Sequence, residues 1–161
     1  MDKLPAAVQT AGAHANGKGE QQMTQARQDP TAYTQTPAFE AGREVRSEVM
    51  GAQYVQRAFE AAQQQGDVGL QQLVTEFAWG TVWTRDGLDR KQRSLATVSM
   101  LIALNRPQEL TGHLRGALAN GVTPQELREL VVHSAVYCGF PAALDAGRKL
   151  TDVLEAAGAK E

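Results

Sequence analysis

The sequence has a single cysteine, Cys138, among its 161 residues. One thiol can form neither a disulfide within the chain nor a CxxC redox pair. A concentrated basic tract is also missing, because 16 Lys and Arg residues are spread out against 18 Asp and Glu residues, giving a formal net charge of -2. Nucleic-acid-binding proteins normally gather positive charge on one face. We therefore expect no nucleic-acid partner.

Long apolar runs and metal-ligand patterns are missing as well. The longest uncharged apolar run, from Ser94 to Leu104, is shorter than the about 20 residues that a membrane-spanning helix needs. The N-terminus lacks the apolar core of a signal peptide. The histidines at positions 14, 113 and 133 show no ligand spacing, and no phosphate loop or dinucleotide fingerprint occurs. The expectation is a cytoplasmic protein with no membrane partner, no metal and no cofactor.

The first part of the chain differs in composition from the rest. Residues 1–37 are rich in Ala, Gln, Thr and Gly and show neither the helical nor the strand period. We predict a flexible N-terminal extension over these residues. Residues 38–161 are then expected to form one domain with a core of its own.

From Phe39 onward, apolar residues recur at helical spacing and no convincing strand pair is present. The predicted class is all-α, a bundle of about six helices. The expected helices are residues 38–64, about 69–83, a third after Asp89, a fourth from Pro107 to Gly121, a fifth from Thr123 to Gly139, and a sixth from Pro141 to near Gly158.

Two of these helices begin with strong capping signals. Asp89 is followed three residues later by Gln92, and Thr123 by Glu126, with Pro124 in the first turn. Both patterns are typical of a capping box, in which the cap side chain and the third helical residue each satisfy the other's backbone amide. The helix after Asp89 is apolar nearly all round in its second half, which predicts a central position in the fold.

His113 is the main candidate for a catalytic side chain. It lies beside the apolar positions Leu110 and Leu114, and Glu109 precedes it by one helical turn. Arg106 lies two turns earlier on the same face. A carboxylate one turn from an imidazole can orient it and raise its basicity, which suits proton transfer near neutral pH. The alternative is a hydrogen-bonded histidine at the edge of the core.

Several aromatic residues and the thiol carry weaker signals. Trp79 and Trp83 are one turn apart and can line a pocket, although such pairs more often belong to the core. His133 and Tyr137 are also one turn apart. They can enter the same cavity or lie at a subunit contact. Cys138 has no neighbouring base and is expected to be a small buried residue.

Three arginines flank the start of the expected central helix: Arg85, Arg90 and Arg93. Guanidinium groups hold carboxylates through paired hydrogen bonds. A small dianionic substrate would need one or two of them. Arg90 is interpreted as a solvated charge, and Arg93 is better placed because it begins the turn that leads into the apolar segment.

A set of short segments carries a family resemblance. The segments are Ala78-Trp79-Gly80 with Val82-Trp83, Arg85 to Arg90 with Arg93-Ser94-Leu95, His113 to Ala117, Asn120 to Thr123, and Ala135 to Ala143. In order and spacing they resemble the carboxymuconolactone decarboxylase family over roughly residues 40–157. The first 37 or so residues lie outside the resemblance.

The resemblance implies an AhpD-like helical fold and a homo-oligomer, a trimer or hexamer, with sites near subunit contacts. It implies cofactor-free decarboxylation of 4-carboxymuconolactone to 3-oxoadipate enol-lactone, in the catabolism of aromatic compounds through protocatechuate and β-ketoadipate. The electrons left by the departing CO2 flow through the ring double bond to the lactone carbonyl. Such a lactone carboxylate carries its own electron sink, so the reaction requires no pyridoxal, thiamine or metal.

The resemblance and the chemistry together suggest roles for individual residues. His113 is expected to donate a proton or to stabilise the oxyanion, with Glu109 orienting it. Arg93 and Arg85 are expected to hold the carboxylate of the acetate arm, because neutralising the departing carboxylate would oppose loss of CO2. The other expected substrate-binding residues are Trp79, Trp83, His133 and Tyr137.

Two other functions remain open. AhpD-like peroxidases share the fold class and use a CxxC pair followed by a histidine. Here Arg106 and Glu109 stand at the two cysteine positions and His113 stands at the histidine position. The chain therefore lacks the thiols that peroxide reduction by a CxxC pair requires. The other alternative is a non-catalytic helical oligomer that binds a small acid, because fold analogy alone does not establish an activity.

Overall fold

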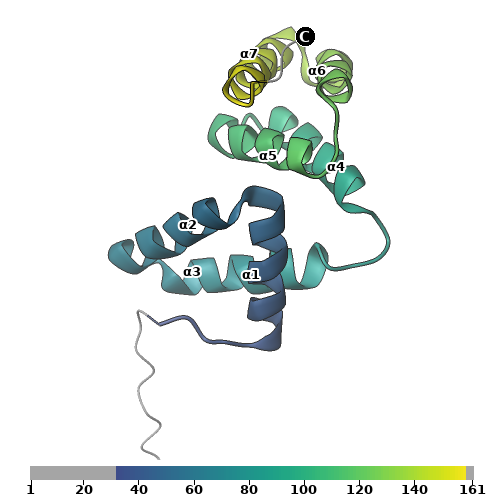
Figure 1. Ribbon diagram of the computed structural model, residues 1–161. Coiled ribbons are helices and arrows are strands. Elements are labelled where there is room, and N and C mark those ends of the chain that lie inside the picture. The colour runs from purple at the N-terminus through teal and green to yellow at the C-terminus, as the bar shows by residue number, and fades with distance from the viewer. Residues whose placement is uncertain (1–31, 159–161) are drawn as a thin grey trace, which may run out of the picture.

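A computed structural model describes residues 32–158 of the chain, and within this range every regular element is a helix (Figure 1). The all-α class predicted from the sequence is confirmed. The helices are α1 (Pro37–Met50), α2 (Ala52–Gln65), α3 (Val68–Leu73), the π-helix η1 (Val74–Val82), α4 (Arg90–Ala103), α5 (Pro107–Ala119), α6 (Pro124–Cys138) and α7 (Phe140–Ala156).

Two of the predicted helices are each divided in two. The single helix expected over residues 38–64 is broken at Gly51, whose φ of 93° has no place in a right-handed helix. The helix expected over residues 69–83 is α-helical only to Leu73 and continues as a nine-residue π-helix. The apolar spacing did not reveal either change, because one glycine and one change of pitch disturb the pattern very little.

The two predicted capping boxes are confirmed. The Asp89 carboxylate accepts a hydrogen bond from the backbone amide of Gln92 at 2.7 Å, and the Gln92 side chain accepts one from the amide of Asp89 at 3.0 Å. Thr123 and Glu126 make the same reciprocal pair at the start of α6. These side chains satisfy amides that lack partners in the first turn, so they determine where α4 and α6 begin.

The helices form two groups, joined by the loop that follows η1. Figure 1 shows α1, α2 and α3 on one side of the molecule and α4 to α7 on the other. The core of the second group includes Val98, Leu114 and Leu127, and all three are fully buried. Helix α4 contacts α5, α6 and α7, as a central helix should. Met100 on α4 and Leu104 just after it nevertheless remain exposed, so residues 32–158 do not cover this face of the helix.

Glycines bring α1 very close to η1. A Cβ atom on Gly42 would lie 2.0 Å from the carbonyl oxygen of Thr75, and one on Gly80 would lie 2.0 Å from that of Ala38. Both distances are far inside van der Waals contact, so only glycine permits this approach. A glycine also permits a close but less tight contact between the two groups of helices, since Gly116 of α5 lies against Val49 of α1. The crossing of α1, η1 and α5 is therefore tightly specified.

The residues just before α1 lie against the first group of helices. The Tyr33 ring is stacked on Phe39, 5.5 Å between centroids, and its hydroxyl donates to the carbonyl of Phe59 at 3.0 Å. Thr36 caps α1 by accepting from the amide of Phe39. Residues 33–36 of the predicted extension are thus in contact with the domain, whereas residues 1–31 lie outside the described residues. The domain boundary after residue 37 stays a prediction.

Candidate functional site

A stack of aromatic rings lies where the two groups of helices meet. The rings of Trp79, on η1, and His113, on α5, are parallel within 1°, with their centroids 6.2 Å apart. Trp83 packs beside Trp79, with the ring centroids 4.8 Å apart and the planes tilted by 30°. Trp79 is only 5% exposed, while His113 and Trp83 are half-buried. The structure therefore brings together three of the residues that the sequence predicted for the site.

The surroundings of His113 favour its neutral form. Burial lowers the pKa of the imidazole below its ordinary value of 6.5, and the positive charge of Arg46 lowers it further. The Glu109 carboxylate acts in the opposite direction but does not cancel these effects. A neutral imidazole carries one N–H donor and one acceptor nitrogen, so at pH 7 His113 can donate a hydrogen bond without carrying a charge.

Arg46 belongs to the site's surroundings but was not found from the sequence. It is 6% exposed and lies on the buried face of α1, between Gly42 and Val49. The sequence does contain a signal for this burial, because helical spacing places Arg46 on the same face of α1 as the core residues Phe39 and Val49. The many other charged residues of this helix obscure that signal. Its Nη1 donates to the Gln71 side chain at 2.8 Å and to the Thr75 hydroxyl at 3.3 Å.

The predicted partner of His113 lies on the surface. Glu109 is exposed in the first turn of α5, and within residues 32–158 no hydrogen bond joins it to His113. It therefore acts on the imidazole through its charge. Arg106, one residue before the helix begins, is exposed as well.

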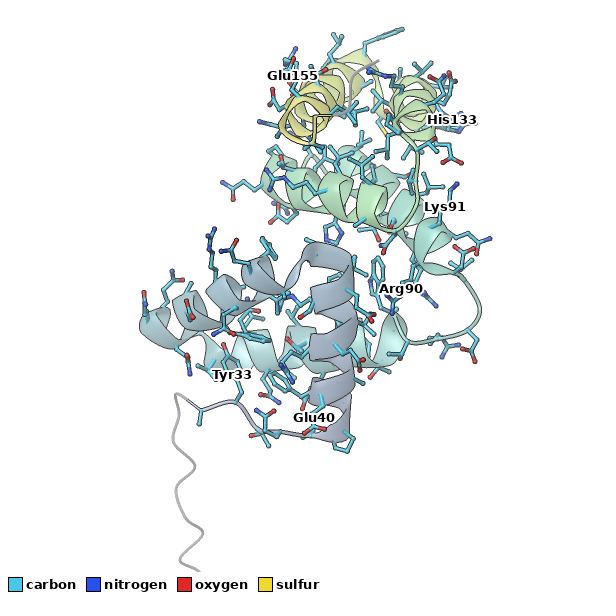
Figure 2. The ribbon with its side chains drawn as sticks, viewed as in Figure 1. Tyr33, Glu40, Arg90, Lys91, His133 and Glu155 are labelled. Carbon is cyan, nitrogen blue, oxygen red and sulfur yellow. The ribbon has the colours of Figure 1, made fainter. Side chains whose placement is uncertain are left out.

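The three arginines around the start of α4 do not form a carboxylate clamp with one another. Arg93 uses its guanidinium to donate to the carbonyl oxygens of Leu88 at 3.1 Å and Arg85 at 2.7 Å. These bonds fasten the loop to the first turn of α4. The Arg85 side chain is exposed. Arg90 forms an ion pair with Glu48 of α1, near the position labelled in Figure 2. The predicted carboxylate-binding role of Arg85 and Arg93 stays a prediction.

His133 and Tyr137 form a separate pair on α6. Their rings are 5.0 Å apart and both residues are exposed, with Tyr137 at 76%. Figure 2 shows His133 on the outer side of α6, in the second group of helices. In the part of the chain that the structure describes, neither ring contacts the Trp79–His113 stack. Cys138, the last residue of α6, is half-buried against the core of this group.

Glu76, near the start of the π-helix, holds the N-terminal segment. Its carboxylate accepts hydrogen bonds from the Thr36 hydroxyl and from the Gln72 amide, the latter at 2.7 Å. These donors stabilise the charged form and lower the pKa of Glu76. The carboxylate is thus engaged with α1 and is not directed to the tryptophans.

A broad apolar groove lies away from the ring stack. It has a volume of about 1380 Å³ and runs between α6 and α7. Val136 and Phe140, among its lining residues, are 78% and 74% exposed. None of its lining residues belongs to η1, so the groove and the His113 stack are distinct surfaces.

Within residues 32–158 no helix combines the length and apolarity needed to cross a bilayer. In the same range, the structure gathers no cluster of three or more His, Cys, Asp or Glu side chains at metal-binding distance.

Comparison with known proteins gives the same family as the sequence motifs. The chain is 51% identical over 108 residues to a nitrosuccinic acid decarboxylase of Metarhizium robertsii, a match that covers 67% of this chain and 75% of the relative. It is 45% identical over 105 residues to a 4-carboxymuconolactone decarboxylase of Acinetobacter baylyi, covering 65% and 78%. The family's sequence pattern matches residues 69–152, which include both tryptophans and His113. The chain belongs to the carboxymuconolactone decarboxylase family.

Proposed function

We propose that this chain is a carboxy-lyase that decarboxylates 4-carboxymuconolactone to 3-oxoadipate enol-lactone, in the catabolism of aromatic compounds through protocatechuate and β-ketoadipate. The observation that carries the proposal is the half-buried His113 ring, stacked on Trp79 at the junction of the two groups of helices. Two decarboxylases among the relatives support the reaction class.

The reaction is balanced without an oxidant or a reductant. The bond between the γ carbon and its carboxylate breaks, CO2 leaves, and the electron pair forms a new ring double bond. The original double bond shifts toward the lactone carbonyl, whose oxygen takes the negative charge. Uptake of one proton at the α carbon then restores the carbonyl and gives the enol-lactone. The protein must stabilise the developing oxyanion, which is usually the largest contribution to such catalysis.

In this proposal His113 supplies that stabilisation. Because its pKa is lowered, the ring is neutral at pH 7 and its N–H can donate to the lactone oxygen as charge develops there. This favours the oxyanion-binding role over that of a charged proton donor, and water then supplies the proton. Trp79 holds the plane of the imidazole, Trp83 packs beside Trp79, and the Glu109 carboxylate acts on the pKa of the ring from the surface.

A second substrate is supported by the relative that is 51% identical, whose name specifies nitrosuccinic acid. In that compound the nitro group takes the electrons released by the departing carboxylate, as the lactone carbonyl does in carboxymuconolactone. Both compounds also share a succinate unit: the carbon that loses CO2 bears a CH2–COO⁻ arm that is retained. The site would therefore need an oxyanion donor and a group that recognises the retained arm.

Turnover of the two compounds tests the proposal. The purified chain is incubated with each, and CO2 release is measured together with lactone absorbance or nitronate formation. His113→Leu, which leaves no side-chain donor, is expected to lower kcat by roughly 100- to 1,000-fold, as loss of one oxyanion donor does. Gln108→Leu, an exposed change on the same helix, serves as the control. A folded His113→Leu protein with unchanged turnover would refute the role of His113. Turnover of neither compound by the wild-type chain would refute the proposed function.

We also propose that the chain assembles into a homotrimer or homohexamer through the apolar face of α6 and α7. Val136, Tyr137 and Phe140 are each more than 70% exposed there. Contiguous apolar patches of this kind mark interaction sites on soluble proteins. His133 would then lie at a subunit contact, in agreement with one of its two sequence-based interpretations.

A further inference from the structure

Arg46 is a buried cation, and the residues that the structure describes place no anion beside it. Its side-chain partners are the neutral Gln71 and Thr75, and its guanidinium lies over the Phe59 ring, 5.7 Å from the centroid. Among residues 32–158 no carboxylate forms an ion pair with it. Its Nε atom is buried and has no hydrogen-bond partner.

This arrangement is costly for a purely structural residue. Removing a charged group from water costs several kcal/mol unless a partner of opposite charge compensates. An arginine remains charged in proteins, so it cannot avoid the cost by losing its proton. A buried N–H without an acceptor adds to the penalty and requires an explanation. A ligand carboxylate at Nε would provide both the missing charge and the missing acceptor.

Contacts connect Arg46 to the ring stack. Arg46 donates to Thr75, and Thr75 precedes Trp79 by four residues, about one turn of the π-helix. Trp79 in turn is stacked on His113. The same neighbourhood is reached from the other side, because Met50, one turn beyond Arg46 on α1, lies against Gly112, next to His113.

The electrostatics agree with this placement. The charge of Arg46 acts on the imidazole of His113 and contributes to lowering its pKa. The spatial link between the two groups is the set of contacts through Thr75 and Trp79 and through Met50 and Gly112. Gly42 and Gly80 fix α1 on η1 so closely that the guanidinium has little freedom to move away.

We propose that Arg46 binds the retained CH2–COO⁻ arm of the substrate and so determines specificity for compounds that contain a succinate unit. The inference rests on the proposed function. The retained arm is the suitable target, since a guanidinium on the departing carboxylate would stabilise the charge that must be lost as CO2. Because Nε is buried, binding of the arm requires the side chains around it to move.

Succinate is the probe for this site, because it contains the shared unit and cannot be decarboxylated by this route. Binding is measured by calorimetry and by the shift in Tm, at ionic strength matched with sodium chloride. Arg46→Met is compared with wild type and with Arg43→Met, an exposed arginine one turn earlier on α1. We expect roughly 30-fold or greater loss of succinate affinity in Arg46→Met and none in Arg43→Met.

The stability of the variant separates this role from a structural one. Replacing an unpaired buried charge with an apolar side chain is often neutral or stabilising, so Arg46→Met without succinate is expected to keep or raise its Tm. Should it fail to fold, Arg46→Lys retains a cation but loses the Nε–H, and at least about tenfold weaker succinate binding is expected because the paired geometry is lost.

The outcomes distinguish this inference from the proposed function. A chain that turns over carboxymuconolactone or nitrosuccinate, with KM and succinate affinity unchanged in Arg46→Met, overturns the inference and leaves the function intact. A chain that binds succinate through Arg46 but turns over neither compound keeps the inference and loses the function. Absence of any succinate-dependent Tm shift in the wild-type chain also overturns the inference.

Discussion

The backbone of Ala38 lies so close to Gly80 that the two residues leave no room for a side chain between them. A Cβ on Gly80 would meet the carbonyl oxygen of Ala38 at 2.0 Å, and backbone atoms cannot rotate aside as a flexible side chain can. This contact holds η1, and with it Trp79, against α1. The geometry of the ring stack therefore depends on a residue that has no side chain.

Gly80→Ala is expected to destabilise the chain by about 1–3 kcal/mol or more, as overpacking against rigid neighbours does. Urea denaturation measures the change in the free energy of unfolding. The control is Gly69→Ala in α3, where a new Cβ meets nothing within 4 Å, and which should be neutral or stabilising by up to about 1 kcal/mol. Equal stability of Gly80→Ala and wild type would contradict the close approach.

The lowered pKa of His113 makes stability depend on pH in a definite direction. The unfolded chain binds a proton near pH 6.5, whereas the folded chain resists it to lower pH. Stability is therefore expected to fall as the pH is lowered through 6.5 and to level off below the folded-state pKa. Tm measured from pH 8 to pH 5 should show a smaller decline in His113→Asn than in wild type. An identical decline in the two proteins would contradict the assignment.

Tryptophan fluorescence offers a second measurement of the same group. The chain has two tryptophans, and both belong to the stack with His113. Protonation of a ring stacked on Trp79 should change the emission, with a midpoint below pH 6.5. The transition is expected to vanish in His113→Asn and to persist in His133→Asn.

Substitution of Arg93 separates a role in the loop from a role in binding. Arg93→Gln removes the hydrogen bonds to the carbonyls of Leu88 and Arg85, so we expect faster tryptic cleavage after Arg85, by about tenfold for bonds from a charged group. We expect KM to stay within about threefold of the wild-type value. Removal of a buried side chain that binds a substrate carboxylate would raise KM far more. A KM increase of roughly 30-fold would instead support the carboxylate-binding role predicted for Arg93.

A charge placed on the apolar face of α6 should prevent assembly. Val136 is 78% exposed, so Val136→Asp costs little in a monomer but would bury an unpaired carboxylate in an interface. Light scattering coupled to size exclusion is expected to show a monomer for this variant and the wild-type assembly for Gln125→Asp, an exposed change at the start of the same helix. A wild-type chain that is already monomeric would refute assembly through this face.

Much of this protein could be predicted from short-range patterns. Apolar spacing predicted the all-α class, Asp89 with Gln92 and Thr123 with Glu126 predicted two helix starts, and motifs around Trp79 and His113 predicted the family. These signals depend on residues within a few positions of one another, where backbone geometry alone places them together. The pairing of His113 with Glu109 was suggested by the same local spacing, but the structure leaves Glu109 on the surface.

The sequence by itself thus determined the all-α class, two helix caps and the family, because each follows from neighbours along the chain. Only the tertiary structure decided that Trp79 meets His113 and that Arg46 is buried with no anion beside it among residues 32–158. Those relationships depend on how α1, η1 and α5 cross, which is set by contacts between residues far apart in sequence. Whether a charged side chain is exposed to solvent or buried without a partner depends on that crossing. Burial is a property of the packed helices and not of any one helix.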